Sequence, residues 1–254
     1  MFSLENKNAV ITGGGSGIGR AISLLFAKEE ANVHIVDINK DDAEALVKEI
    51  EAAGGNAMAH PCNVSDQQLI TEVFKKINKI DVLVNSAGVS HIGKAHTTTE
   101  ADMDRLYNIN IKGVYNSLHA AIPLMQQQGG GIIVNICSIA ARVGLQDRFA
   151  YSMTKGAVYS MTLSTARDYL ADNIRCNCVS PARVHTPFVD GFIAKHYPGK
   201  EKEIFEQLSK SQPIGRMAKP EEIAALVLFL SSEEAAFITG TDYPIDGGFL
   251  TLNG

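Results

Sequence analysis

The sequence contains few cysteines and none in a pattern that suggests a disulfide scaffold. Four occur among 254 residues, and no two form a C-x-x-C pair. Cys176 and Cys178 have the spacing of alternate positions on one strand, so we expect the thiols to act as small core residues. Such cysteine usage is typical of a reducing compartment, and we expect a cytoplasmic protein.

Long apolar runs and blocks of positive charge are also missing. No apolar stretch reaches the ~18 residues that a spanning helix needs, so no membrane segment is predicted. No run of lysine and arginine exceeds two residues and the formal net charge is −5, which argues against a nucleic-acid surface. The histidines form no H-x-x-x-H pair, so no metal site is expected. The first residues lead directly into a strand-like run, so no signal peptide is expected.

The pattern that is present is an alternation of short β-branched runs with longer amphipathic ones. Strands are predicted at 9–12, 33–36, 57–61, 81–84, 132–137, 174–179 and 243–245, and helices at 17–30, 41–53, 66–78, 99–110, 112–128, 151–170 and 221–230. This alternation predicts an α/β fold with a doubly wound parallel sheet, Rossmann-like, in three αβα layers.

No linker rich in Gly, Ser or Pro divides the chain, so we predict a single domain over residues 1–254. Residues 184–212 interrupt the alternation with two short helical patterns around Tyr197-Pro198-Gly199. This segment follows a strand end, where a lid or substrate loop is expected.

A glycine-rich turn follows the first predicted strand and opens the first helix. The turn runs from Thr12 to Gly19, and its predicted contacts to a ligand come from Gly13, Ser16, Gly17, Ile18 and Gly19. Glycines let backbone N–H groups at a helix N-terminus approach a pyrophosphate, which predicts a dinucleotide site. The alternative is a merely flexible turn, which the strand before it and the helix after it disfavour.

Asp37 ends the second predicted strand, 18 residues after Gly19. A carboxylate at this place accepts hydrogen bonds from an adenosine ribose and repels a 2′-phosphate. No Lys or Arg lies in the glycine turn, so the predicted cofactor is NAD rather than NADP. The alternative is an ordinary helix-capping Asp.

Tyr151 and Lys155 are four residues apart, and Ser138 lies thirteen residues before the tyrosine. Positions i and i+4 share a face of a helix, so the ammonium can favour the tyrosinate. Beside a nicotinamide, this pair suits proton removal from an alcohol while the cofactor takes the hydride. For the pair alone, the alternative is a half-buried Tyr and a solvated Lys. For Ser138, it is a hydroxyl that bonds backbone at a strand end.

These motifs resemble the short-chain dehydrogenase/reductase superfamily in its compact single-domain form. The resemblance spans nearly the whole chain and includes Asn85-Ser86-Ala87-Gly88, Asn110, Pro181 with Thr186-Pro187, and Asp246-Gly247-Gly248. It implies Tyr151 as general acid/base, Lys155 as a ligand of the nicotinamide ribose, Ser138 as the group that orients the substrate oxygen, and Asn110 as the residue that positions a water joining Lys155 to solvent. The cofactor contacts that it adds are Asn63, Val64, Asn85, Ala87, Gly88, Tyr151, Lys155, Pro181, Val184 and Thr186.

The resemblance also implies a homotetramer formed through helices 112–128 and 151–170. The chain departs from the family pattern at three places. Asn63 stands where Asp is frequent, Ser86 replaces a frequent Asn, and Ala182-Arg183 replace the usual Pro-Gly continuation after Pro181. Because the third departure lies beside the expected nicotinamide position, we expect it to bear on substrate choice.

The expected substrate contacts are Ser138, Arg148, Tyr151, Arg183 and His185. A guanidinium three residues before Tyr151 suits bidentate capture of a carboxylate; the alternative is a solvated or subunit-bridging Arg. Residues 148–155 are similar to cytosolic type 2 3-hydroxybutyrate dehydrogenases, in which an Arg at the matching place holds the substrate carboxylate. Residues 181–187 are similar to bacterial dehydrogenases of sugar acids such as 2-keto-3-deoxy-L-fuconate.

A sugar acid is therefore the favoured substrate, because Arg183 and His185 suit a polyhydroxylated acid. The alternatives are a 3-hydroxybutyrate-type hydroxy acid, a neutral sugar, an NADPH-dependent 3-oxoacyl reduction, and a non-catalytic NAD sensor.

Overall fold

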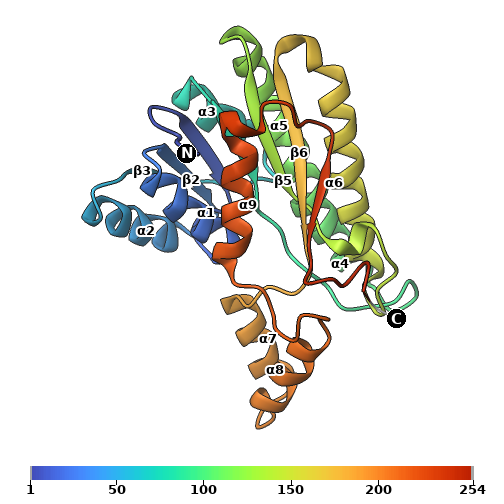
Figure 1. The fold of residues 1–254 in the computed structure, drawn as a ribbon. Helices are drawn as coiled ribbons and strands as arrows, with labels where there is room; N and C mark the ends of the chain where they lie inside the picture. Colours follow the sequence, from blue (N-terminus) through green and yellow to red (C-terminus); the bar gives the residue numbers. More distant parts are fainter. Residues whose placement is uncertain (1, 253–254) are drawn as a thin grey trace.

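Seven parallel strands form one sheet in a computed structural model that describes residues 2–252, apart from the side chains at 188, 195 and 196. The strand order is β3-β2-β1-β4-β5-β6-β7, and every neighbouring pair is parallel. The strands are β1 (Asn8–Thr12), β2 (Asn32–Asp37), β3 (Asn56–Pro61), β4 (Val82–Asn85), β5 (Gly131–Ile136), β6 (Ile174–Pro181) and β7 (Asp242–Ile245). The predicted doubly wound sheet is confirmed (Figure 1).

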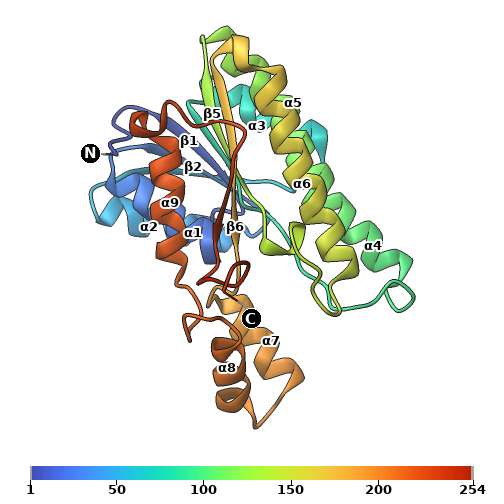
Figure 2. The same cartoon turned by 45° about the vertical axis from the view of Figure 1, so that its right-hand side comes forward.

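Helices cover both faces of the sheet, which gives the three layers seen in Figures 1 and 2. One face carries α1 (Gly17–Lys28), α2 (Lys40–Ala52) and α9 (Pro220–Ser231), and the other carries α3 (Gln67–Ile77), α5 (Gly113–Gln127) and α6 (Phe149–Asp168). Each face has its own apolar core. Phe26 of α1 is fully buried in the first and Phe74 of α3 in the second. Burial of these two stripes is the main force that holds the helices to the sheet.

The strand order reverses between β1 and β4, because β2 continues from β1 in one direction and β4 in the other. In open α/β sheets, the crevice outside the carboxyl ends of the strands at this reversal is the usual ligand site. The glycine turn follows β1 at this place. The fold therefore positions the predicted dinucleotide motif at the reversal point.

The helices predicted at 99–110 and 112–128 are joined, contrary to the expected break. Helix α4 (Glu100–Leu106) continues through a π-helical turn, η1 (Tyr107–Lys112), into α5. Leu106, Tyr107, Lys112 and Gly113 all keep right-handed helical dihedrals, so the chain never leaves the helix. Periodicity missed the continuity because the wider π turn shifts the apolar positions out of the 3.6-residue register.

Two helices after β6 project beyond the carboxyl edge of the sheet, at the foot of the molecule in Figure 1. They are α7 (Pro187–His196) and α8 (Glu201–Lys210), and they form the segment predicted as a lid. Short 3-10 turns complete the described elements: η2 (Ile139–Ala141), η3 (Leu170–Asp172) and η4 (Glu233–Ala235). Within residues 2–252, none of the helices combines the length and the apolarity that crossing a bilayer requires.

Candidate active site

A cavity of about 560 Å³ opens at the carboxyl edge of the sheet, between the glycine turn and the lid. Most predicted cofactor contacts line it: Gly13, Ser16, Gly17, Ile18, Gly19, Asp37, Asn63, Val64, Ala87, Gly88, Tyr151, Lys155, Pro181, Val184 and Thr186. Ser138, Arg148 and Arg183 line it as well. The cavity therefore brings together residues from almost the whole length of the chain.

At Gly13 and Gly19 of the glycine turn, neighbouring backbone lies so close that there is no room for a side chain. A Cβ at Gly19 would lie 2.0 Å from the carbonyl oxygen of Gly13. Gly13 itself has φ +64°, and a Cβ there would lie 2.7 Å from the Cα of Ala87. The Thr12 hydroxyl accepts hydrogen bonds from the backbone N–H groups of Ser86 (3.2 Å) and Ala87 (3.3 Å). These contacts fix the N-terminus of α1 against the end of β4, where a pyrophosphate would be held.

Asp37 is 9% exposed and lines the cavity at the end of β2. Its Oδ2 accepts from the Gly15 N–H (2.9 Å) and its Oδ1 from the Asn39 N–H (2.9 Å). The cap of α2 is Asn39, whose side chain accepts from the backbone N–H groups at 41 and 42, so Asp37 is not the helix cap. The carboxylate is thus anchored beside the glycine turn. Among the described residues, the cavity's lysine and arginine side chains are Arg148, Lys155 and Arg183, which come from α6 and the segment after β6.

Tyr151 and Lys155 lie on one side of α6, in its first turns. The Lys155 Nζ is 5.9 Å from the centre of the Tyr151 ring. Lys155 is 7% exposed, and its ammonium donates to the Ile136 carbonyl (2.8 Å) at the end of β5. The helix thus presents a phenol and an ammonium to the same cavity.

Ser138 follows β5 and faces the same cavity. Its Oγ accepts a hydrogen bond from the Ala140 N–H (3.1 Å) and caps the turn η2. Ser138 therefore does bond the backbone at the strand end, but this hydrogen bond uses only one lone pair of the hydroxyl oxygen. The hydroxyl proton can still be donated to a substrate oxygen.

Asn110 is 1% exposed and does not line the cavity. Its Oδ1 accepts from the Val89 N–H (2.8 Å), and its Nδ2 donates to the Val89 carbonyl (2.9 Å) and to the Thr154 hydroxyl (3.0 Å). The carboxamide thus ties the π-helical turn η1 to the loop after β4 and to α6. The water that we expect Asn110 to position stays a prediction.

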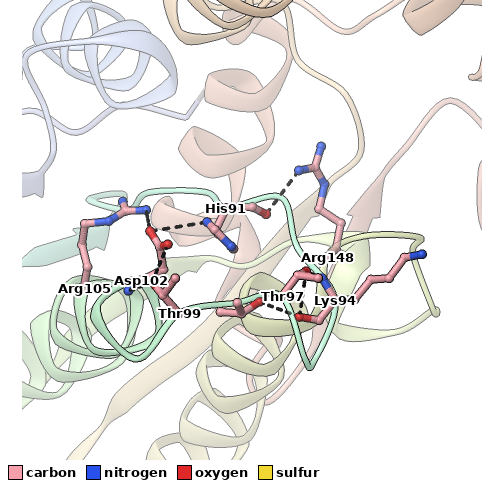
Figure 3. A network of polar contacts seen from close by, with 8 residues as sticks. His91, Lys94, Thr97, Thr99, Asp102, Arg105 and Arg148 are labelled. Carbon is pink, nitrogen blue, oxygen red and sulfur yellow. Dashed lines mark hydrogen bonds and ion pairs between the residues drawn. The ribbon is translucent and has the colours of Figure 1, made fainter.

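Arg148 precedes α6 and is held by the loop after β4, as Figure 3 shows. Its Nη1 donates to the His91 carbonyl (3.3 Å), and Gly93 pairs with Arg148 in a short parallel bridge. The loop is attached to α4 because the His91 ring lies 3.5 Å from Asp102, which is also paired with Arg105 (3.1 Å). Burial is the main cause that lowers the pKa of the Arg148 guanidinium.

Arg183 follows β6, and its Nε donates to the Ser211 hydroxyl (3.0 Å) at the end of α8. Burial and then the charge of Arg148 lower the pKa of Arg183. Two guanidinium groups therefore share the cavity. No carboxylate within residues 2–252 pairs with either of them.

Two predicted contacts are not in the cavity. The Asn85 side chain donates to the Asn135 Oδ1 (2.8 Å) inside the sheet, because alternate strand residues point to opposite sides. The His185 ring pairs with Asp190 (2.8 Å) and packs on the Phe205 ring, with 4.9 Å between centroids. Neither side chain lines the cavity, and the two contacts stay predictions.

Other lining residues were not predicted, among them Leu145, Gln212, Met217 and Phe249. Gln212 and Met217 come from the segment after α8, Leu145 from the segment before α6, and Phe249 from the segment after β7. No group of three or more His, Cys, Asp or Glu side chains in the described part of the chain could hold a metal ion.

Comparison with known proteins agrees with this geometry. A family model described as enoyl-(acyl carrier protein) reductase matches residues 13–250. The 3-oxoacyl-[acyl-carrier-protein] reductase FabG of Thermotoga maritima is 39% identical over 251 residues, which cover 97% of this chain and 99% of that protein. The 2-keto-3-deoxy-L-fuconate dehydrogenase of Xanthomonas campestris pv. campestris is 35% identical over 247 residues, covering 97% and 81%.

A solved structure of L-sorbose reductase from Gluconobacter frateurii, complexed with NADPH and L-sorbose, superimposes with a TM-score of 0.94 at 28% identity and covers 99% of both chains. Family model, relatives and solved structure all match over nearly the full length of the chain, and the glycine turn, Ser138, Tyr151 and Lys155 meet in one cavity. The chain belongs to the short-chain dehydrogenase/reductase superfamily and is an oxidoreductase that acts on alcohol and ketone groups.

Proposed function

We propose that the protein is an NAD-dependent dehydrogenase that interconverts a secondary alcohol and a ketone on a polar, carboxylate-bearing substrate. The favoured class is a sugar acid of the 2-keto-3-deoxy-L-fuconate type. The observation that carries this proposal is the pair Arg148 and Arg183, two guanidinium groups that line the cavity with Tyr151 and have no carboxylate partner among the described residues; Arg148 is partly buried and Arg183 is exposed. A substrate carboxylate would supply a partner for these cations.

Ser138, Tyr151 and Lys155 have different roles at the alcohol oxygen. The nicotinamide, when bound, supplies the hydride acceptor. The Ser138 hydroxyl donates to the substrate oxygen and orients it. The Tyr151 phenolate removes the hydroxyl proton, and the Lys155 ammonium stabilises that phenolate. In the reverse direction, the Tyr151 phenol returns the proton to the oxygen.

Asp37 supports NAD as the cofactor. Its carboxylate is fixed by two backbone N–H groups at the edge of the glycine turn, where it would repel a 2′-phosphate. In the first turns of α1 and α2, Arg20 is paired with Glu49 and Lys40 with Glu44. The L-sorbose reductase structure, which has the same fold, holds NADPH. The fold alone therefore does not determine the cofactor, and the proposal of NAD depends on Asp37.

A smaller 3-hydroxy acid is the second candidate. Arg148 alone, three residues before Tyr151, would place a carboxylate close to the reacting carbon. The Thermotoga relative named as a 3-oxoacyl-[acyl-carrier-protein] reductase makes an acyl substrate a third candidate. The two guanidinium groups in the lining, Arg148 and Arg183, oppose it.

We also propose that residues 1–254 form one domain, built on the single sheet, and that four chains associate through α5 and α6. Tyr115 of α5 and Met153 and Leu163 of α6 are exposed. The small residues Gly156, Ala157, Ser160 and Ser164 on α6 would allow a partner helix to approach closely. The four cysteines are free and buried, which supports a reducing, cytoplasmic location.

The test is a substrate panel with NAD⁺ and NADP⁺: 3-hydroxybutyrate, gluconate, fuconate, 2-keto-3-deoxy acids, and uncharged alcohols of similar size. We expect the highest kcat/KM on a sugar acid with NAD⁺. Arg148→Met should raise KM for the acids far more than for a neutral alcohol. Turnover of the uncharged alcohols alone would refute the carboxylate proposal.

A further inference from the structure

Gln212 lies just after α8 and lines the cavity, although no sequence motif marks it. It is 3% exposed. Its Oε1 is buried and accepts no hydrogen bond from the described residues. Buried acceptors of this kind are rare in folded proteins, and each one calls for an explanation.

The neighbouring serine fixes the orientation of this amide. The Ser211 hydroxyl donates its only proton to the Leu208 carbonyl (2.6 Å). Ser211 Oγ must therefore accept from its other neighbours, and it does so from the Gln212 Nε2 (3.0 Å) and from the Arg183 Nε (3.0 Å). If the amide were flipped, the Gln212 Oε1 would face the Ser211 Oγ, and neither oxygen would have a proton to donate to the other. The Gln212 Oε1 consequently points away from Ser211.

The same serine holds the guanidinium of Arg183. With Nε bonded to Ser211, the two Nη groups of Arg183 keep their donors for a ligand in the cavity. Two groups of opposite character thus lie together at the end of α8: the donor fork of Arg183 and the buried acceptor of Gln212. Both are tied to the end of α8 through one hydroxyl.

We propose that Arg183 and Gln212 form a second substrate subsite that recognises a hydroxyl other than the one that is oxidised. A hydroxyl accepts from the guanidinium and donates to the amide oxygen, whereas a carboxylate has no proton for Gln212. An ammonium is disfavoured because Arg148 and Arg183 are both cationic. This inference rests on the proposed function, in which Arg148 binds the carboxylate, and it defines the substrate as a polyhydroxylated acid rather than a simple 3-hydroxy acid.

The test compares two acids of equal chain length: the best six-carbon sugar acid of the panel, and 3-hydroxyhexanoate, which carries only the reacting hydroxyl. Gln212→Met keeps the size of the side chain and removes the acceptor. We expect the ratio of kcat/KM for the sugar acid to that for 3-hydroxyhexanoate to fall at least about tenfold, mainly through KM. The matched control is Gln207→Met on the exposed part of α8, which should leave the ratio within about twofold of wild type.

Thermal unfolding and NADH binding are measured for each variant, so that misfolding is recognised. If Gln212→Met does not fold, Ser211→Ala replaces it, because loss of the Ser211 hydroxyl frees both the amide and the guanidinium and should lower the same ratio. An unchanged ratio, or an equal loss on both acids, would overturn the subsite while the proposed function stands. A wild-type enzyme that oxidises neither acid but oxidises neutral alcohols would overturn the proposed function and the subsite together.

Discussion

At the scale of single residues, the proposed mechanism gives Ser138 the task of orienting the substrate oxygen and Tyr151 that of transferring its proton. The Ser138 oxygen accepts from a backbone N–H, and Tyr151 shares its side of α6 with the Lys155 ammonium, which is hydrogen-bonded to the Ile136 carbonyl. The proposed mechanism therefore depends on the phenol for proton exchange.

Tyr151→Phe removes the phenolic oxygen and keeps the ring. We expect kcat to fall by at least about 10²–10⁴-fold, the range of general acid–base catalysis, while NADH binding stays measurable. Fluorescence titration and steady-state rates of the purified variant test this. Tyr159→Phe, on the same helix, is the control and should keep wild-type rates. Comparable turnover in the two variants would end the assignment.

Asp37→Ser removes the carboxylate that is proposed to bind the adenosine ribose and keeps a hydroxyl as acceptor. Because repulsion of the 2′-phosphate is lost, the ratio of kcat/KM with NADP⁺ to that with NAD⁺ should rise about tenfold or more. Asp41→Ser, an exposed change on α2, should leave the ratio unaltered. An Asp37→Ser enzyme with the cofactor preference of wild type would show that this carboxylate does not select NAD.

At the scale of elements, adjacent strands place His34 of β2 and His60 of β3 side by side. Their ring nitrogens Nδ1 and Nε2 are 3.0 Å apart. Burial lowers the pKa of His34. Burial, the charge of His34 and the charge of Lys76 lower the pKa of His60 to about 4. The folded sheet edge therefore requires these imidazoles to be neutral.

This requirement predicts a pH dependence of stability. In the unfolded chain, both rings take up protons below about pH 6.5, whereas in the folded chain His60 stays neutral down to about pH 4. The free energy of unfolding should therefore decline as the pH falls from 6.5 towards 4. Urea unfolding of His60→Gln across this range should show a weaker decline than wild type. His119→Gln, an exposed change on α5, should show the full decline, and identical slopes for His60→Gln and wild type would contradict the assignment.

At the scale of the whole molecule, α5 and α6 keep apolar side chains at the surface after both cores are complete. Leu163→Glu on α6 places a charge in the proposed contact, so light scattering should detect dimers or monomers where wild type gives tetramers. Leu69→Glu, an equally exposed change on α3, should stay tetrameric. A wild-type chain that is monomeric at micromolar concentration would refute the assembly.

The sequence predicted what local chemistry determines and missed what depends on packing between distant segments. The glycine turn, Asp37 and the Tyr151–Lys155 pair each follow from a strand or helix and its immediate neighbours, and all lie in the cavity. Gln212 reaches the cavity only because the lid folds back over the sheet edge, so no nearby pattern marks it. The position of the His185 ring likewise depends on packing, since its partners Asp190 and Phe205 are on the lid helices.

The π-helical turn η1 has one further consequence. A helix rotates by about 100° with each residue, so removing a single residue from 107–112 would restore ordinary α-helical bonding and turn α4 by that angle about its axis. The Asn110 carboxamide would then face away from Val89 and Thr154, and the Asp102 carboxylate away from His91. The contacts of Asn110 with α6 and the attachment of the loop that holds Arg148 thus depend on the one additional residue in the π-helical turn.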